Sequence, residues 1–286
     1  MTQDSTSKMF LGLDIKTWLG LTGLGAVIST IGALFGIVLK DYFFTRSLER
    51  WKQRQTLEQV YQRFRDPLVL AVRELASRTL EILDHYPTVY LRDEVLASRP
   101  TKQIENSIAD AYFQRYKLVS TAYRLSAFLG WLELYRQEMT FLRPGNNKHA
   151  KALDVAVGRI RSDLADGQIN LAEDWHEWRD TLVFREELRA IGESLIESRG
   201  STHAVMGYGR YCEHLESGSP NEVQRWSPVV FNFYLDLETH GKDFRRVRLQ
   251  RMLVHLVELM RLLEPSSVEP HLREAAAKLQ PEAAGE

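Results

Sequence analysis

A long uncharged apolar run near the N-terminus constrains this chain more than any other feature. No residue between Lys16 and Lys40 carries a charge. As an α-helix, residues 19–39 would span about 32 Å at ~1.5 Å per residue, which matches the bilayer hydrocarbon core of about 30 Å. The run is longer than the apolar region of a cleaved signal peptide, and it does not end in an A-x-A pattern. We therefore predict a transmembrane helix at 18–39 that acts as an uncleaved signal anchor.

The charges that flank this run predict its orientation. On the N-terminal side, residues 1–17 contain Lys8 and Lys16. Five basic residues follow closely on the C-terminal side: Lys40, Arg46, Arg50, Lys52 and Arg54. Because the cytoplasmic flank of a span carries the excess of Lys and Arg, we expect a single-pass inner-membrane protein with its N-terminus outside and its C-terminal domain in the cytoplasm. We also expect the five basic residues to contact the lipid surface; the alternative is that they only set the topology.

Two rows of small residues lie within the run, and the members of each row are four residues apart. The rows are Gly25, Ser29 and Ala33, and Gly32 and Gly36. Helices associate in lipid where small side chains let two backbones approach closely. The rows thus predict a helix-pairing interface, through which the chain associates with itself or with another membrane protein. The alternative is that glycine is simply common in membrane helices.

Helical periodicity continues beyond the apolar run. Residues 40–66 are predicted to form a basic juxtamembrane helix that continues the transmembrane helix, since no Gly or Pro lies between Gly36 and Pro67. Asp66 and Pro67 have the form of an N-cap and first helical position, and they predict a new or kinked helix there. Further helices are predicted at 103–142, 148–164, 171–179, 181–198, 203–216, 222–237 and 243–263.

These segments predict an all-α fold, with one cytoplasmic multi-helix domain at 67–264. Asn221 and Gln224 have capping-box spacing at the start of one of the helices, with Asn in place of Ser or Thr. The residues 265–286 contain three prolines and few apolar residues, which predicts a flexible C-terminal tail with at most one loose turn. Short strands are an alternative at two places rich in β-branched and aromatic residues: 86–91 and 229–235.

One acidic helix start holds the residues that come closest to a metal site. On a helix, four side chains would share one face and present oxygen and nitrogen ligands: Glu173, His176, Glu177 and Asp180. A Glu-x-x-His pair occurs in di-iron helical bundles, but those sites need a second copy of the pair, which this chain lacks. We therefore interpret the four residues as a solvated, ion-paired helix face, and we predict no metal site and no cofactor.

The predicted helix 103–142 has two apolar stripes. One stripe consists of Tyr112, Tyr116, Val119 and Tyr123. Two arginines, Arg115 and Arg124, lie beside it. The other consists of Leu118, Ala122, Leu125, Leu129 and Leu132. A helix that is apolar on much of its circumference packs at the centre of a bundle, so we predict core packing; a ligand pocket against the tyrosines is the alternative. Arg124 and Glu133 argue against a second membrane span here.

Two further motifs have structural interpretations. Residues 206–212 begin like a dinucleotide-binding glycine motif, but Cys212 replaces the third glycine and no strand is predicted before it. We expect Gly207 and Gly209 to allow close helix packing, and Cys212 to be a buried structural cysteine. Arginines crowd residues 242–251, where we expect them to form the solvated face of the last helix.

The composition narrows the classes of function. A formal net charge of −1 argues against a dedicated nucleic-acid-binding protein. The common nucleotide-binding, serine-hydrolase and zinc-protease motifs are absent from the sequence. The layout is typical of bacterial single-span proteins with a helical cytoplasmic part. We predict a non-enzymatic, membrane-anchored interaction module, such as an assembly, accessory or signalling subunit. The alternative is a membrane-tethered ligand-sensing or enzymatic domain with a pocket near helix 103–142.

Overall fold

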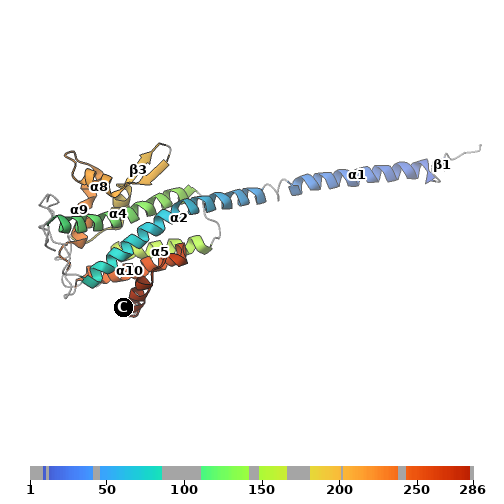
Figure 1. The fold of residues 1–286 in the computed structure, drawn as a ribbon. Coiled ribbons are helices and arrows are strands. Elements are labelled where there is room, and N and C mark those ends of the chain that lie inside the picture. Colours follow the sequence, from blue (N-terminus) through green and yellow to red (C-terminus); the bar gives the residue numbers. More distant parts are fainter. Residues whose placement is uncertain are drawn as a thin grey trace, which may run out of the picture. The chain divides into compact units, whose positions relative to one another are not determined.

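The computed structural model describes residues 9–10, 13–40, 46–85, 111–141, 148–165, 181–200, 202–237 and 243–283. Within these residues the protein is mostly helical, with nine α-helices, as the sequence predicts (Figure 1). The chain forms two compact units, Met1–Glu58 and Gln59–Glu286, which we call unit 1 and unit 2 and describe separately. The predicted helix at 171–179 and the alternative strand at 86–91 lie outside the described residues.

The main element of unit 1 is the helix α1 (Ile15–Leu39). Two short strands, β1 (Met9–Phe10) and β2 (Leu13–Asp14), pair antiparallel just before it. The helix α2 (Arg46–His85) begins in this unit and continues into unit 2. Residues 41–45 lie outside the described part, so an unbroken helix from the apolar run into the juxtamembrane segment stays a prediction.

Pro67 lies inside α2, and the helix has no new start at this position. An interior proline removes one backbone hydrogen bond and crowds the preceding turn, at a cost of about 3 kcal/mol. On both sides of Pro67 the helix buries side chains in one core, with Phe64 and Leu68 each 3% exposed. Burial of each such side chain contributes about 1.5–3 kcal/mol, which offsets the cost of the proline. A new helix start at Pro67 is therefore wrong, because packing overrides the local signal, and a kink at this proline stays a prediction.

Unit 2 packs the second half of α2 against a set of further helices (Figure 1). These are α4 (Ala111–Phe141), α5 (Lys148–Ala165), α7 (Arg185–Glu193), α8 (Tyr208–Leu215), α9 (Glu222–Tyr234), α10 (Phe244–Leu263) and α11 (Pro270–Ala283), with a short 3-10 helix, η3 (Pro265–Ser267). The most extensive helix pairs are α5 with α10 and α4 with α7. The Phe64 ring of α2 meets the Trp131 ring of α4 edge-on, so α2 and α4 share the same core.

The crossing of α4 with α7 is so close that it requires glycine. A Cβ atom on Gly192 of α7 would lie 2.7 Å from the carbonyl oxygen of Leu129 in α4. A Cβ atom on Gly130 would lie 3.2 Å from the Val205 side chain. The stripe predicted for the centre of the bundle is buried around this crossing, with each member at most 3% exposed: Leu118, Ala122, Leu125, Leu129 and Leu132. Core packing of this stripe is thus confirmed.

A β-hairpin occupies part of the chain for which the sequence predicts helices at 181–198 and 203–216. The strands β3 (Ile196–Arg199) and β4 (Thr202–Val205) pair antiparallel, with Ile196 opposite Val205. The turn between them begins at Gly200, which has a φ of 64°, a conformation that glycine adopts without strain. The predicted helices are wrong over these residues because the turn at Gly200 outweighs a weak helical pattern. The alternative strand at 229–235 is also wrong, since α9 covers most of it.

The C-terminal residues form a packed helix where the sequence predicts a flexible tail. α11 lies against α10, and its Leu272 and Ala276 are 0% and 3% exposed. Val268, before the helix, is also buried. These three apolar residues recur every four positions and form a narrow buried stripe on an otherwise polar segment. The three prolines in this region obscure the stripe, although Pro270 stands at the first position of α11, where proline is tolerated.

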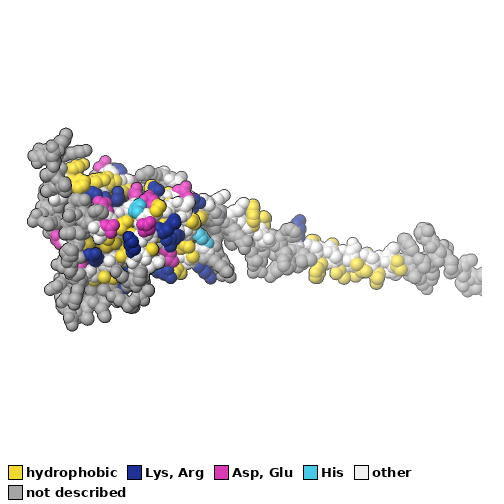
Figure 2. All heavy atoms as spheres, turned by 60° about the horizontal axis from the view of Figure 1, so that its bottom comes forward, with side chains coloured by type: hydrophobic (Ala, Val, Ile, Leu, Met, Phe, Trp, Pro, Cys, Tyr) yellow, Lys and Arg dark blue, Asp and Glu magenta, His cyan; other side chains and the backbone are white. Residues whose placement is uncertain are grey.

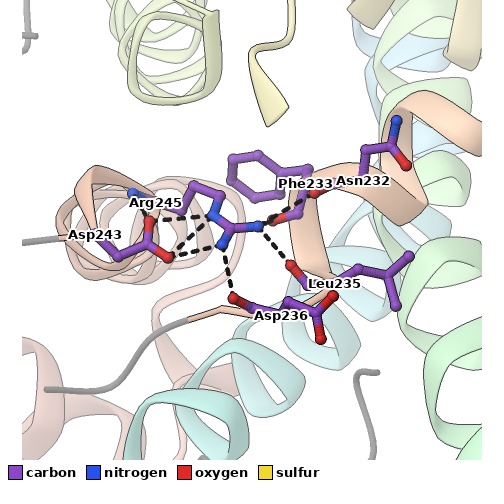
Figure 3. Close-up of polar contacts among 6 residues, drawn as sticks. All are labelled: Asn232, Phe233, Leu235, Asp236, Asp243 and Arg245. Atoms are coloured by element: carbon purple, nitrogen blue, oxygen red, sulfur yellow. Dashed lines mark hydrogen bonds and ion pairs between the residues drawn. The ribbon is translucent and has the colours of Figure 1, made fainter. Parts of the chain in front are cut away.

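A buried arginine joins the end of α9 to the start of α10 (Figure 3). Arg245 is 2% exposed, and its Nη2 lies 2.8 Å from Oδ2 of Asp243. The guanidinium also donates to the carbonyl oxygens of Leu235 at 2.6 Å, Asp236 at 3.0 Å and Asn232 at 3.2 Å. Asp243 caps α10 by accepting a 2.9 Å hydrogen bond from the Arg245 backbone N–H. The arginine therefore satisfies carbonyls that the end of α9 leaves without helical partners.

Arg248 is the second buried arginine of α10. It is 2% exposed and donates to the carbonyl oxygen of Asp163 at 2.8 Å. The expectation that residues 242–251 present their arginines to solvent is therefore wrong for Arg245 and Arg248. Both side chains are held by acceptors from earlier segments of the chain, which a local sequence pattern does not reveal.

Candidate membrane and interaction surfaces

The side chains of α1 from Leu19 to Ile37 are all exposed. The large apolar ones are 57–68% exposed, and Figure 2 shows hydrophobic side chains following one another along this helix. Among the residues that the structure describes, this is the one helix long and apolar enough to cross a membrane. By length and composition the helix fits a membrane span, and a signal sequence near an N-terminus meets the same criteria.

Two threonines of α1, Thr22 and Thr30, bond to the helix itself. Oγ1 of Thr30 donates to the carbonyl oxygen of Ala26 at 2.8 Å, and Oγ1 of Thr22 donates to that of Leu19 at 3.1 Å. A hydroxyl bonded to its own helix leaves no unsatisfied donor, which is the requirement for a polar side chain in hydrocarbon. Thr22 and Thr30 are thus compatible with a lipid environment.

The two small-residue rows of α1 face open space. A Cβ atom added to Gly25, Gly32 or Gly36 would meet no heavy atom within 4 Å. Ser29 and Ala33 are exposed as well. Within the described chain nothing covers these rows, and helix pairing through them stays a prediction.

The basic residues predicted to contact lipid lie at the end of α1 and in the N-terminal part of α2. Lys40 directly follows α1, and Lys52 lies exposed on the second turn of α2. The other three, Arg46, Arg50 and Arg54, are also α2 residues. Beside them, α2 exposes Leu48 at 50% and Trp51 at 54%. An exposed Trp next to Lys and Arg is typical of a membrane–water interface. Trp51 is visible in the sequence, but a prediction from the charges alone does not use it.

The four weak metal candidates, Glu173, His176, Glu177 and Asp180, lie outside the described residues. In the part of the chain that the structure describes, no group of three or more His, Cys, Asp or Glu side chains is arranged to hold a metal ion.

The tyrosine row of α4 packs against α8. The Tyr208 ring lies 5.4 Å from that of Tyr123 and 6.2 Å from that of Tyr116. The Tyr123 hydroxyl donates to the carbonyl oxygen of Met206 at 3.1 Å, and Tyr211 is fully buried beside it. Burial raises the pKa of Tyr211 to about 12, although hydrogen bonds with Ser227 and Ser126 oppose the shift. These contacts favour core packing over a pocket at the tyrosines.

The glycines of residues 206–212 do not pack against another helix. Gly207 is the N-cap of α8, and Cβ atoms on Gly207 and Gly209 would meet no heavy atom within 4 Å. The predicted packing role of these glycines is therefore wrong. Cys212 is half-buried, and burial raises the pKa of its thiol despite a hydrogen bond with Tyr208. A raised pKa disfavours the thiolate, which fits a structural cysteine.

Two grooves lie beside α11. One has a volume of about 560 Å³ and lies between α2, α10 and α11. The other, of about 360 Å³, lies between α5, α10 and α11. The larger groove has apolar residues (Leu80, Leu83, Ala275 and Leu279) and charges of both signs (Glu81, Asp84, Arg246, Glu274 and Lys278). Neither groove is lined by α4, the helix near which a ligand pocket is the alternative prediction.

The interface between α5 and α10 contains polar pairs that the sequence does not predict. Nδ1 of His255 lies 2.6 Å from Oδ2 of Asp163. Arg159 donates to both carboxylate oxygens of Glu258 at 2.9 Å. The partners are 92 and 99 residues apart, so no local pattern links them. Because the pairs bridge two packed helices, their simplest role is to fix the α5–α10 interface.

The chain has no detected relative among known proteins. No family model matches the chain, and no curated protein or solved structure matches it either. The surfaces described above are therefore the basis for function.

Proposed function

We propose that the protein is a membrane-anchored helical interaction module, with its N-terminus outside and unit 2 in the cytoplasm. The exposed apolar surface of α1 carries this proposal. Nine large apolar side chains between Leu19 and Ile37 are exposed, and burial of each contributes about 1.5–3 kcal/mol. No charged residue opposes insertion, and the basic residues with Trp51 suit a cytoplasmic interface.

Unit 2 would contact the partner, and the larger groove beside α11 supports this role. Its apolar residues lie among acidic and basic side chains. An apolar centre with a polar rim is the composition of a protein–protein interface. The small-residue rows of α1 offer a second surface, on which the chain would associate with itself or with another membrane protein.

Alkaline carbonate extraction with N-terminal sequencing tests the anchor. We expect the full chain to stay in the membrane pellet with residues 1–17 attached. Recovery of a shortened chain in the supernatant, cut after the apolar run, would show a cleaved signal sequence instead and refute the anchor.

Cysteine labelling in intact cells tests the orientation. In a Cys212→Ser background, Ser5→Cys places a thiol before α1 and Ser266→Cys places one in unit 2. We expect a membrane-impermeant maleimide to label Ser5→Cys in intact cells and Ser266→Cys only after lysis. The opposite pattern would reverse the topology.

Crosslinking in native membranes tests the interaction role. We expect a crosslinked product larger than the monomer, and we expect Gly32→Leu combined with Gly36→Leu to remove it if pairing uses that row. Gly23→Leu, outside both rows, is the matched control and should keep the product. A wild-type chain that is recovered only as a monomer, without a co-purifying protein, would contradict an interaction module.

A further inference from the structure

The helix α11 is attached to the rest of unit 2 by few apolar side chains. It lies at the edge of the unit, against α10 (Figure 1). Among its described side chains, Leu272 and Ala276 are buried, and Val268 before the helix is buried as well. Ala275 is half-buried and Ala277 is exposed. Because an alanine buries much less apolar surface than a leucine, α11 is held less firmly than the helices of the core.

Open grooves lie on both sides of α11. Ala275 and Leu279 line the groove of about 560 Å³, whereas Ala276 and Ala277 line the groove of about 360 Å³. Successive residues of a helix are rotated by about 100°, so these two pairs lie on different sides of α11. The site that α11 occupies is therefore wider than α11. A helix with longer apolar side chains at positions 275 and 277 would fill it more completely.

The face of α10 beside α11 has the composition of an interface. The α10 residues that line the two grooves are Arg246, Gln250, Val254, Val257, Glu258 and Arg261. The two valines form an apolar centre, and polar residues lie toward both ends of the helix. An apolar centre with a polar rim is typical of protein–protein interfaces. α11 is thus bound to α10 in the way that a ligand helix is bound in a recognition groove.

The larger groove also has an acidic end. Asp84, near the end of α2, makes no hydrogen bond or ion pair with any residue that the structure describes. Glu81, in the same groove, is paired with Lys117 at 2.5 Å. The C-terminal end of a helix is electronegative, which adds to the negative charge of Asp84. A basic residue on a docked helix suits this end, and Lys278 of α11 lines the same groove.

We propose that the α11 site binds an amphipathic helix of a partner protein, which displaces α11. The partner helix would have large apolar side chains at the positions of Ala275 and Ala277 and a basic residue at the position of Lys278. α11 covers the site when the partner is absent. This inference rests on the proposed interaction role of unit 2 and names the site and the kind of partner.

A labelled peptide tests displacement in the full chain, held in a neutral detergent. The peptide has the sequence of residues 265–286 with Ala275→Leu and Ala277→Leu, and we call it the leucine peptide. Fluorescence anisotropy should show saturable binding, at least about tenfold tighter than that of the unchanged 265–286 peptide, because the leucines bury apolar surface in the grooves. On binding, the amides of α11 in the protein should exchange hydrogen faster, whereas those of α10 stay protected.

Two control peptides test the side chains. Arg273→Leu adds an apolar side chain outside both grooves, so this change alone should leave the peptide as weak as the unchanged one. Lys278→Glu in the leucine peptide places a negative charge in the groove that contains Asp84. It should weaken binding about two- to fivefold, as expected for an exposed charge pair.

The same two leucines in the protein itself give the decisive comparison. A full chain with Ala275→Leu and Ala277→Leu holds its own α11 more tightly, and α11 competes as a tethered ligand. This chain should bind the leucine peptide at least about tenfold more weakly than the wild type. Equal binding by the two chains, no binding by the wild type, or binding that leaves α11 exchange unchanged would overturn the proposal.

Crosslinking in native membranes separates this inference from the proposed function. If the leucine peptide does not bind but the membranes still give a crosslinked product, this inference fails and the interaction role stands on another surface. If the peptide displaces α11 but the membranes give only monomer without a co-purifying protein, the proposed function fails and the helix-binding site remains.

Discussion

α1 and α4 are both long helices rich in apolar residues, yet they differ in the charged residues that they contain. α1 has 25 residues, and no charge lies between Lys16 and Lys40. α4 has 31 residues and carries charges with partners on other helices. Lys117 pairs with Glu81 of α2, and Glu133 pairs with Arg136 and with Arg189 of α7. An apolar helix inside a bundle can thus keep charges where neighbouring groups supply the counter-charges, whereas a helix surrounded by lipid without such neighbours must be free of them.

The glycines of the two helices differ in the same way. Gly32 and Gly36 of α1 face open space, whereas Gly130 of α4 meets Val205. In unit 2, close contact with Val205 explains why position 130 is a glycine. In α1, a neighbouring helix at Gly32 and Gly36 is proposed only from the spacing of the small residues. Substitutions in the two helices should therefore have different effects.

Removal of a buried counter-charge in unit 2 should have the largest effect. Arg245→Leu leaves Asp243 and the carbonyls at the end of α9 without their donor. Breaking a buried ion pair costs about 3–5 kcal/mol. We expect the free energy of unfolding, measured by tryptophan fluorescence in urea, to fall by about that amount. Arg246→Leu, which changes the half-buried neighbour, should cost less than about 1 kcal/mol. Equal losses for the two variants would show that the pairing in Figure 3 does not stabilise the fold.

A charge placed in the middle of α1 tests whether this helix tolerates a charged residue without a counter-charge. Ile28→Arg should raise the cost of membrane insertion by about 2.5–3.5 kcal/mol, because α1 offers no counter-charge. We expect most of the variant to leave the carbonate-resistant membrane fraction. Ile28→Val keeps the position apolar and should behave as the wild type. An Arg variant that stays fully in the pellet would mean that a partner helix supplies an acid, or that another part of the chain holds the protein at the membrane.

One added methyl group compares the glycines of the two helices. Gly192→Ala puts a Cβ atom 2.7 Å from a backbone oxygen of α4, so the helices must move apart. We expect a loss of about 1–3 kcal/mol in the free energy of unfolding, as for other overpacked sites. Gly32→Ala meets nothing within 4 Å and should leave the unfolding of unit 2 unchanged. A Gly192→Ala variant as stable as the wild type would show that α4 and α7 can move apart without loss of stability.

The sequence predicts local features of this fold better than contacts between distant residues. Asn221 accepts from the Gln224 backbone N–H at 3.0 Å, as their spacing predicts. The buried stripe of α4 agrees with its sequence pattern as well. Arg245 is buried because it bonds to carbonyls at the end of α9, and the Asp163–His255 pair joins residues 92 positions apart, so no helical periodicity reveals either. Glu133 is similar: in the sequence it is one charge within an apolar helix, and its burial is explained by Arg136 beside it and by Arg189 on α7.

The smallest expected effect concerns pH. Burial alone would raise the pKa of Glu133, but hydrogen bonds from Arg136 and Gln137 and the charges of Arg136 and Arg189 lower it below the ordinary value of 4.5. A carboxyl group with a lowered pKa in the folded state stabilises that state above pH 4.5, and this stabilisation is lost as the pH falls through the folded-state pKa. Glu133→Gln should therefore destabilise unit 2 at pH 7, by less than Arg245→Leu does because the amide can still accept hydrogen bonds, and the difference from the wild type should shrink below pH 4.5. Arg136→Gln removes the same pair from the other side, so its urea midpoint should show the same trend with pH. If the difference between the wild type and Glu133→Gln stays constant from pH 7 to strong acid, the negative charge of Glu133 does not stabilise the fold. Arg136 and Arg189 would then need another acceptor.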